Sequence, residues 1–147
     1  MTGSSPIPDA GAGYAGDVSP TQAYELLAED DAVLVDVRTQ PEWHFVGLPD
    51  LAPLGKLVIG VPWQQYPDGS LNHEFVDQLA RAGVPENATV LFICRSGARS
   101  RSAAIAATTA GYTTAYNVAD GFEGPVDQHG HRTSRGWKAA GLPWRQS

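Results

Sequence analysis

The only cysteine of the 147-residue chain lies between a predicted strand and a predicted helix. Residues 90–93 are β-branched, aromatic or aliphatic, which is typical of a buried strand. Residues 101–107 are rich in alanine and favour a helix that packs closely against its sheet. A loop from Cys94 to Ser100 connects the two, so the sequence places one thiol where a strand gives way to a helix.

The residues of this loop are suited to binding an anion. The first-turn N–H groups of a helix have no intrahelical partners and therefore favour a negative charge at the helix start. Gly97 permits the tight or positive-φ backbone that such a cup needs. Ser100 is a good N-cap for a helix that begins near Arg101. We expect the N–H groups to converge on a cup with Cys94 at its rim.

Three arginines, Arg95, Arg99 and Arg101, are expected to bring positive charge to the same place. Cations and converging N–H groups favour the thiolate, which is the nucleophilic form of cysteine. We therefore expect Cys94 to be reactive. The alternative is that Cys94 is a small buried hydrophobic residue at the end of a strand.

Taken together, these residues resemble the rhodanese (sulfurtransferase) domain family. The resemblance spans about residues 17–144. It implies a three-layer α/β fold, with helices on both faces of a central, mostly parallel five-stranded sheet. It also implies a catalytic Cys94 in a substrate-binding loop. The matching segments are Cys94-Arg95-Ser96-Gly97-Ala98-Arg99-Ser100, Leu34-Val35-Asp36-Val37-Arg38, Glu42-Trp43, Tyr116-Asn117-Val118, Gly121-Phe122 and residues 136–144.

A second predicted strand carries a carboxylate toward the same site. Residues 32–37 form a continuous apolar run interrupted by Asp36, as buried parallel strands do. Open α/β sheets bind ligands at the carboxyl ends of their strands, which places Asp36 near the mouth that holds Cys94. The resemblance implies a charged network of Asp36, Arg38 and Glu42 beside the loop. Either this network contacts substrate, or it only locks the chain that follows the strand.

Several further elements are needed to complete the sheet and its cover. Ser19-Pro20 predicts an N-cap followed by the first residue of a helix that ends near Asp30. Trp63 and Tyr66 could either line a pocket or cap the core, and we expect them to pack on the core. The remaining predicted elements are a short strand at Asp17-Val18, a strand from Lys56 to Val61, an amphipathic helix from Asn72 to Ala82, and a last strand from Tyr112 to Val118.

Residues 125–135 form a polar stretch that looks like an insertion relative to the family. One hypothesis is that it folds as a flap over the Cys94 cup, with His131 or Arg132 helping to recognise an anionic donor. The alternative is an exposed loop. His129 and His131 are too few for a metal site, and we expect no metal or organic cofactor.

Length and charge limit the class of protein. One domain is expected over residues 16–147, after a flexible lead over residues 1–15. The net charge of −6 argues against nucleic acid or an anionic membrane as the main partner. The chain has no apolar run long enough to span a membrane and no signal-peptide pattern. A single free thiol fits a reducing compartment, so we expect a cytoplasmic protein.

The predicted activity is a two-step sulfur transfer. The Cys94 thiolate takes the outer sulfur of a small-molecule donor such as thiosulfate or a persulfide, which leaves a cysteine persulfide. An external thiol, cyanide or a protein acceptor then removes that sulfur, because the chain holds no second cysteine.

Two other function classes stay open. Phosphatases and arsenate reductases also use a cysteine in an anion-binding loop, but their arginine follows five intervening residues, whereas Arg99 follows Cys94 after four. The third class is a binding or sulfur-carrier module without turnover.

Overall fold

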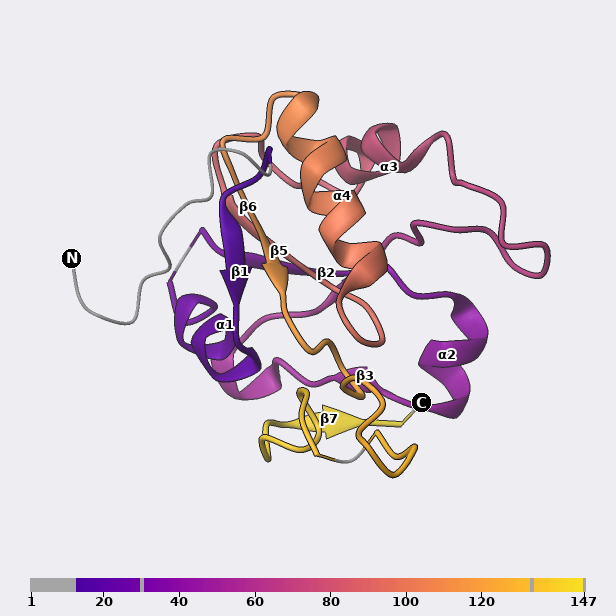
Figure 1. Ribbon diagram of the computed structural model, residues 1–147. Helices are drawn as coiled ribbons and strands as arrows, with labels where there is room; N and C mark the ends of the chain where they lie inside the picture. Colours follow the sequence, from indigo (N-terminus) through magenta and orange to yellow (C-terminus); the bar gives the residue numbers. More distant parts are fainter. Residues whose placement is uncertain (1–12, 30, 133, 147) are drawn as a thin grey trace.

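A five-stranded sheet forms the centre of the protein in the computed structural model, which describes residues 13–29, 31–132 and 134–146. Its strand order is β1-β6-β5-β2-β4, and every neighbouring pair is parallel. Figure 1 shows helices on both sides of this sheet. The predicted α/β architecture is therefore confirmed. The strands are β1 (Gly16–Val18), β2 (Val33–Asp36), β4 (Ile59–Gly60), β5 (Thr89–Ile93) and β6 (Thr114–Val118).

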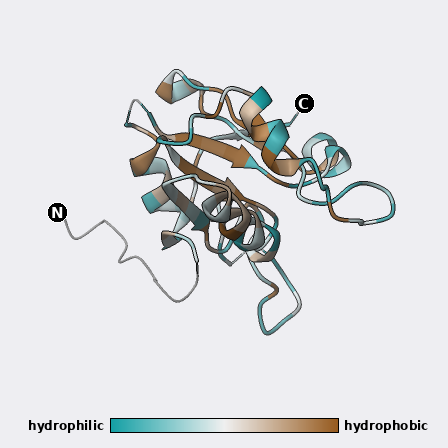
Figure 2. Ribbon diagram, turned by 90° about the horizontal axis from the view of Figure 1, so that it is seen from above, coloured by the Kyte–Doolittle hydropathy of each residue, from teal (hydrophilic) through white to brown (hydrophobic). Residues whose placement is uncertain are grey.

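Strand β5 shows how the sequence builds two cores. Successive side chains of a strand point to opposite faces. Val90 and Phe92 lie in one buried cluster, and Leu91 and Ile93 lie in the other. All four are completely buried, because β5 lies in the middle of the sheet. Figure 2 shows that the strands are mostly hydrophobic, whereas the helices contain both hydrophobic and hydrophilic residues.

Each face of the sheet has its own helices. Helix α1 (Pro20–Leu26) contributes to the cluster that contains Leu91 and Ile93, and Ser19 caps it as predicted. Helices α3 (Phe75–Arg81) and α4 (Ala98–Thr109) contribute to the other cluster. The buried residues of α4 are small, which lets its backbone lie close to the sheet; they are Ser100, Ala103, Ala104 and Ala107.

Helix α4 begins earlier than predicted. Its first residue is Ala98 rather than Arg101, and its N-cap is Gly97 rather than Ser100. Gly97 has φ +114°, a left-handed conformation that glycine adopts without a Cβ penalty. The prediction from Ser100 was wrong because tertiary contacts hold Ser100 inside the first turn, where it is fully buried.

Three other predicted elements are shorter in the structure, since residues near their ends form hydrogen bonds to other segments. Lys56 donates through Nζ to the carbonyls of Leu27, Glu29 and Ala32, so it closes the end of α1 instead of extending β4. Asn72 donates to the Pro62 carbonyl, so α3 starts only at Phe75. The Tyr112 amide donates to Ala107 at the end of α4, so β6 starts at Thr114.

The C-terminal segment adds a feature that the sequence did not indicate. Strand β7 (Trp144–Arg145) pairs antiparallel with β3 (Leu48–Pro49) in a small second sheet. Residues 135–141 form bends and turns around Trp137. Short elements connect this region to the main sheet: α2 (Gln40–Phe45) and a 3₁₀ helix at Ala52–Leu54.

The ordered fold starts before residue 16. The Ala15 amide donates to the Ala115 carbonyl, and Tyr14 is buried in the core with 7% exposure. The flexible lead was therefore predicted to extend too far, because one aromatic residue anchors the chain ahead of β1. Residues 1–12 of that lead lie outside the described residues. Among the described helices, none combines the length and the apolar character needed to cross a lipid bilayer.

Candidate active site

The carboxyl ends of β2, β5 and β6 meet at one edge of the sheet. Asp36, the last residue of β2, is in register with Ile93, the last residue of β5. Phe92 is in register with Asn117, one residue before the end of β6. Cys94 follows Ile93 directly, so the parallel sheet places Cys94, Asp36 and Asn117 in one region. This is the edge at which parallel α/β sheets bind ligands.

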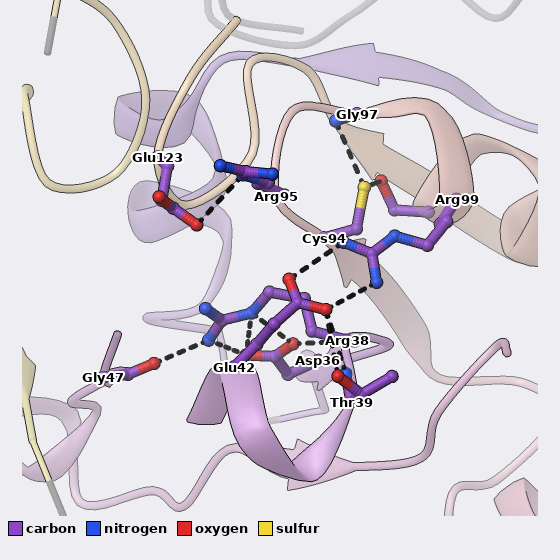
Figure 3. Close-up of polar contacts among 11 residues, drawn as sticks. Asp36, Arg38, Thr39, Glu42, Gly47, Cys94, Arg95, Gly97, Arg99 and Glu123 are labelled. Atoms are coloured by element: carbon purple, nitrogen blue, oxygen red, sulfur yellow. Dashed lines mark hydrogen bonds and ion pairs between the residues drawn. The ribbon is translucent and has the colours of Figure 1, made fainter. Parts of the chain in front are cut away.

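The Cys94 sulfur is held inside the loop that enters α4. The Gly97 N–H donates to Sγ at 3.1 Å (Figure 3). The Ser100 hydroxyl lies 3.2 Å from Sγ. Among the loop N–H groups that were predicted to converge, the one that donates a hydrogen bond to the sulfur is that of Gly97. Ser96 and Ala98 lie beside it in the same loop, half-buried and exposed respectively.

The sequence predicted Cys94 at the rim of the cup. In the structure it lies beneath the rim instead. Only 1% of the residue is exposed, because it continues the buried strand β5 and the loop closes over it. Almost none of Cys94 is therefore open to solvent.

Ser100 joins the sulfur to a second buried polar residue. Its hydroxyl lies 2.5 Å from Asn117 Oδ1 as well as 3.2 Å from the sulfur. Asn117 in turn donates through Nδ2 to Oδ1 of Asp17, an exposed residue. Asn117 lies in the matching segment Tyr116-Asn117-Val118, but the sequence gave it no role at the site. The register of β6 beside β5 brings it to the loop.

Arg99 is bound by a carboxylate rather than free to meet an anion. Its Nη1 and Nη2 donate to the two oxygens of Glu42 at 2.7 and 2.9 Å. Burial by itself raises the pKa of Glu42, but hydrogen bonds from Arg99 and Thr39 and the charge of Arg99 outweigh it and lower that pKa. The hydrogen bond to Glu42 raises the pKa of Arg99 against the effect of burial, and the charges of Glu42, Cys94 and Asp36 add to the rise.

The other two arginines of the predicted cluster lie apart from each other. Arg95 Nε is 3.4 Å from Glu123 Oε2, and its side chain is about half exposed. Arg101 lies over the ring of Tyr14, with 5.8 Å between Cζ and the ring centroid. Each of the three arginines therefore has its own partner, and residues two apart on a helix, such as Arg99 and Arg101, point about 200° apart. That the three gather around one anion stays a prediction.

Asp36 and Arg38 form a buried ion pair below the loop. Arg38 Nη2 lies 2.6 Å from Asp36 Oδ2 and donates to the Gly47 carbonyl at 2.7 Å. Neither side chain is exposed, and the guanidinium carbon is 4.4 Å from the centre of the Phe122 ring. Of the two interpretations left open by the sequence, this geometry fits the structural lock.

The turn after β6 braces the Cys94 loop from the other side. The Phe122 amide donates to the Cys94 carbonyl at 2.8 Å, and the Glu123 amide donates to the Arg95 carbonyl at 3.0 Å. A Cβ on Gly121 would lie 2.5 Å from the Arg95 carbonyl oxygen, so only glycine permits this approach. The sequence suggested a turn here but not its contact with the loop.

Among the described residues of the stretch 125–135, the side-chain hydrogen bonds are formed within the stretch or to its base. Asp127 accepts hydrogen bonds from the amides of His129 and His131 and from the Ser134 hydroxyl. Arg132 donates to the Gly124 carbonyl at the base of the stretch, and His131 is exposed. The role of His131 and Arg132 in a flap stays a prediction.

A groove of about 1020 Å³ lies beside α2, away from Cys94. Trp43, Phe45 and Tyr66 are among its lining residues, and Cys94 is not. Tyr66 is 68% exposed, so the prediction that it packs on the core was wrong, whereas Trp63 does pack against Phe75 with ring centroids 5.2 Å apart. No group of three or more His, Cys, Asp or Glu side chains that could hold a metal ion occurs among the described residues.

Comparison with known proteins agrees with this geometry. The family model of the STR4 middle domain matches residues 15–147. Uncharacterized protein RC0915 of Rickettsia conorii is 41% identical over 131 residues, which cover 88% of this chain and 96% of that protein. The crystal structure of Rv0390 from M. tuberculosis has 54% identity and a TM-score of 0.84, and the match covers 91% of this chain and 99% of that one.

A third similar protein is the polysulfide-sulfur transferase homodimer from Wolinella succinogenes. Its solution structure has 27% identity and a TM-score of 0.62, and the match covers 89% of this chain and 78% of that one. The family model, together with the parallel sheet and the cysteine loop at its carboxyl edge, gives the assignment: the chain belongs to the STR4 middle-domain family, a rhodanese-like family.

Proposed function

We propose that this protein is a sulfurtransferase that carries sulfane sulfur as a persulfide on Cys94. The observation that supports the proposal is the position of the only cysteine. Its sulfur lies in the loop between β5 and α4, where the Gly97 N–H donates to it. Such a site offers a nucleophile and a hydrogen-bond donor for negative charge at the same point.

In the first step the Cys94 thiolate attacks the outer sulfur of a donor such as thiosulfate. A new S–S bond forms at Cys94, the S–S bond of the donor breaks, and sulfite leaves with the electron pair of that bond. The proton of the resting thiol passes to solvent. Polysulfide is a second donor of the same class, and the similarity to the Wolinella transferase supports its inclusion.

Arg99 is the cation best placed to serve this step. Its charge interacts with Cys94, while both of its terminal nitrogens bond to Glu42. An anionic donor therefore competes with Glu42 for Arg99, and opening of this pair gives the donor access to the buried sulfur. Arg95, about half exposed and paired with Glu123, assists at the outer edge.

In the second step an external acceptor takes the terminal sulfur and regenerates Cys94. Cyanide serves in an assay, and a small thiol or a protein thiol serves in a cell. The acceptor comes from outside because the chain has one cysteine. The chemistry needs neither a metal nor an organic cofactor, since sulfur itself is the transferred group.

Mass spectrometry of the intact protein tests the proposal. After thiosulfate treatment we expect the mass to rise by one sulfur atom, to return on addition of cyanide, and to stay unchanged in Cys94→Ser. A parallel assay with p-nitrophenyl phosphate distinguishes the phosphatase class. Absence of the mass gain, with or without phosphatase activity, would overturn the sulfurtransferase proposal and leave the phosphatase or the binding module.

A further inference from the structure

A series of hydrogen bonds connects the Cys94 sulfur to the surface of the protein through β6 and β1. Ser100 Oγ lies 3.2 Å from Sγ and 2.5 Å from Asn117 Oδ1. Asn117 Nδ2 donates to Asp17 Oδ1 at 3.0 Å, and the Tyr14 hydroxyl donates to the same oxygen at 2.7 Å. Ser100 and Asn117 are 0% and 3% exposed, so water does not replace these partners.

The chemistry of these groups fixes the orientation of the Asn117 amide. An ionised carboxylate only accepts hydrogen bonds, so Asp17 must face the NH₂ group of Asn117. The carbonyl oxygen of the amide must then face Ser100. At 2.5 Å, two oxygens repel unless a hydrogen lies between them, so the Ser100 hydroxyl donates to Asn117.

A hydroxyl has one hydrogen, and this one is directed away from the sulfur. Ser100 consequently presents a lone pair to Cys94. A protonated thiol can donate to that lone pair, whereas a thiolate gains nothing from it. A thiolate gains a hydrogen bond from Ser100 only if Ser100 turns its hydrogen to the sulfur, which leaves the buried carbonyl of Asn117 without a donor.

We propose that Asn117 is a positioning residue that, oriented by Asp17, holds the Ser100 hydrogen away from the Cys94 sulfur and so withholds that hydrogen bond from the thiolate. The Gly97 N–H donates to the sulfur in either state. This inference rests on the proposed function only in calling Cys94 the nucleophile. It adds a control of the ionisation of Cys94 by a residue that does not touch the sulfur.

Charged groups around the sulfur also influence its ionisation, and the test must hold them constant. They are the Arg99–Glu42 pair, the Arg95–Glu123 pair, the Asp36–Arg38 pair, Asp120 with Arg135, and Asp17. Replacement of Asn117 by leucine changes none of these charges and keeps the number and branching of the side-chain heavy atoms.

The experiment follows the ultraviolet absorbance of the thiolate against pH, with Cys94→Ser as the blank. The single cysteine makes the signal unambiguous. In Asn117→Leu the Ser100 hydrogen is free to serve the thiolate, so the midpoint of ionisation should move to lower pH by roughly half a unit to one unit. In a Ser100→Ala background the same change should produce no shift.

Two results would contradict the inference: a midpoint that does not fall in Asn117→Leu, or an equal fall when Ser100 is already alanine. If Asn117→Leu does not fold, Asp17→Asn replaces it at an exposed position. This change frees the Asn117 amide to turn. The midpoint of Cys94 ionisation should then fall further with Ser100 present than in Ser100→Ala. Loss of the Asp17 charge affects both backgrounds equally, so the difference between them reports the hydrogen bond.

This measurement needs no sulfur donor, so it is independent of the proposed function. A protein that forms no persulfide can still show the coupled shift, and a working sulfurtransferase can lack it.

Discussion

Glu42 and Arg99 are 57 residues apart in the sequence and form the bidentate ion pair beside Cys94. Both side chains are about one-fifth exposed, so the pair is neither a weakly held surface contact nor a fully buried one. Thr39 also donates to Glu42 at 3.1 Å, which fixes the carboxylate at the start of α2. At the residue scale, Glu42 therefore decides how available Arg99 is to another anion.

Replacement of Glu42 by glutamine should release Arg99 for an anionic donor. We expect the KM for thiosulfate to fall about three- to tenfold, because the competing negative charge is removed while the residue keeps its size. Steady-state assays with thiosulfate and cyanide measure this effect. Glu74→Gln is the matched control, since the Glu74–Arg81 pair is about two-thirds exposed and lies on α3. A KM that rises would show that Glu42 holds Arg99 in its working position.

The same carboxylate should contribute to acid sensitivity. The pKa of Glu42 is lowered in the folded protein, because bonds from Arg99 and Thr39 outweigh the effect of burial. Its contribution to stability is therefore complete above the unfolded pKa of about 4.3 and is lost as the pH falls through the lowered folded value. Urea unfolding from about pH 6 to about pH 3 should show a smaller acid-induced loss in Glu42→Gln than in the original protein. Equal losses would exclude Glu42 as a source of the dependence.

At the scale of elements, the active loop is shaped by a turn that follows a different strand. The Phe122 and Glu123 amides donate to the carbonyls of Cys94 and Arg95, so the chain after β6 determines the path of the chain after β5. Gly121 makes the contact possible through φ +62° and the absence of a side chain. The loop geometry is consequently a property of two neighbouring elements.

Gly121→Ala should damage both stability and activity. The added Cβ would lie 2.5 Å from Arg95 O and 2.6 Å from Cys94 O, and both are backbone atoms that cannot rotate away. Gly55→Ala is the control, because Gly55 also has positive φ (+70°) but has nothing within 4 Å of the added carbon. We expect the control to lose about 1 kcal/mol of unfolding free energy and Gly121→Ala to lose about 2 kcal/mol more. Similar losses of unfolding free energy for the two variants in urea denaturation would mean that the turn accommodates the added carbon, which would contradict the prediction.

At the scale of the whole molecule, the C-terminal segment is part of the core. Trp137 is completely buried in the cluster on the α1 face, and its ring meets Tyr24 of α1 edge-on at 5.8 Å. Its Nε1 donates to the Pro143 carbonyl, which holds the chain in position for β7 to pair with β3. The segment after residue 135 is therefore a structural layer rather than a tail.

Trp137→Ala should destabilise the entire domain. Removal of a fully buried indole costs about 3–5 kcal/mol, whereas Trp144→Ala, at a position 42% exposed, should cost less than about 1 kcal/mol. Chemical denaturation of both variants gives the comparison. Equal and small losses would show that the C-terminal segment folds on the surface without supporting the sheet.

The sequence by itself determined the framework of this protein. Apolar runs ending at Asp36, Ile93 and Val118 were sufficient for a parallel sheet with its site at the carboxyl edge. Strand patterns are readable because side chains alternate between two buried faces, and Gly97 was identifiable because few other residues adopt positive φ. The loop residues also carried the family resemblance.

Only the tertiary structure decided the environment of the sulfur. The burial of Cys94, the capture of Arg99 by Glu42 and the series from Ser100 through Asn117 to Asp17 all join residues from different elements. Helix α4 also starts at Ala98, with Gly97 as its N-cap, because contacts within the fold, rather than the capping preference of Ser100, fix its first turn. Local sequence encodes backbone preference, but hydrogen-bond partners depend on strand register and loop packing, which form only when distant segments meet.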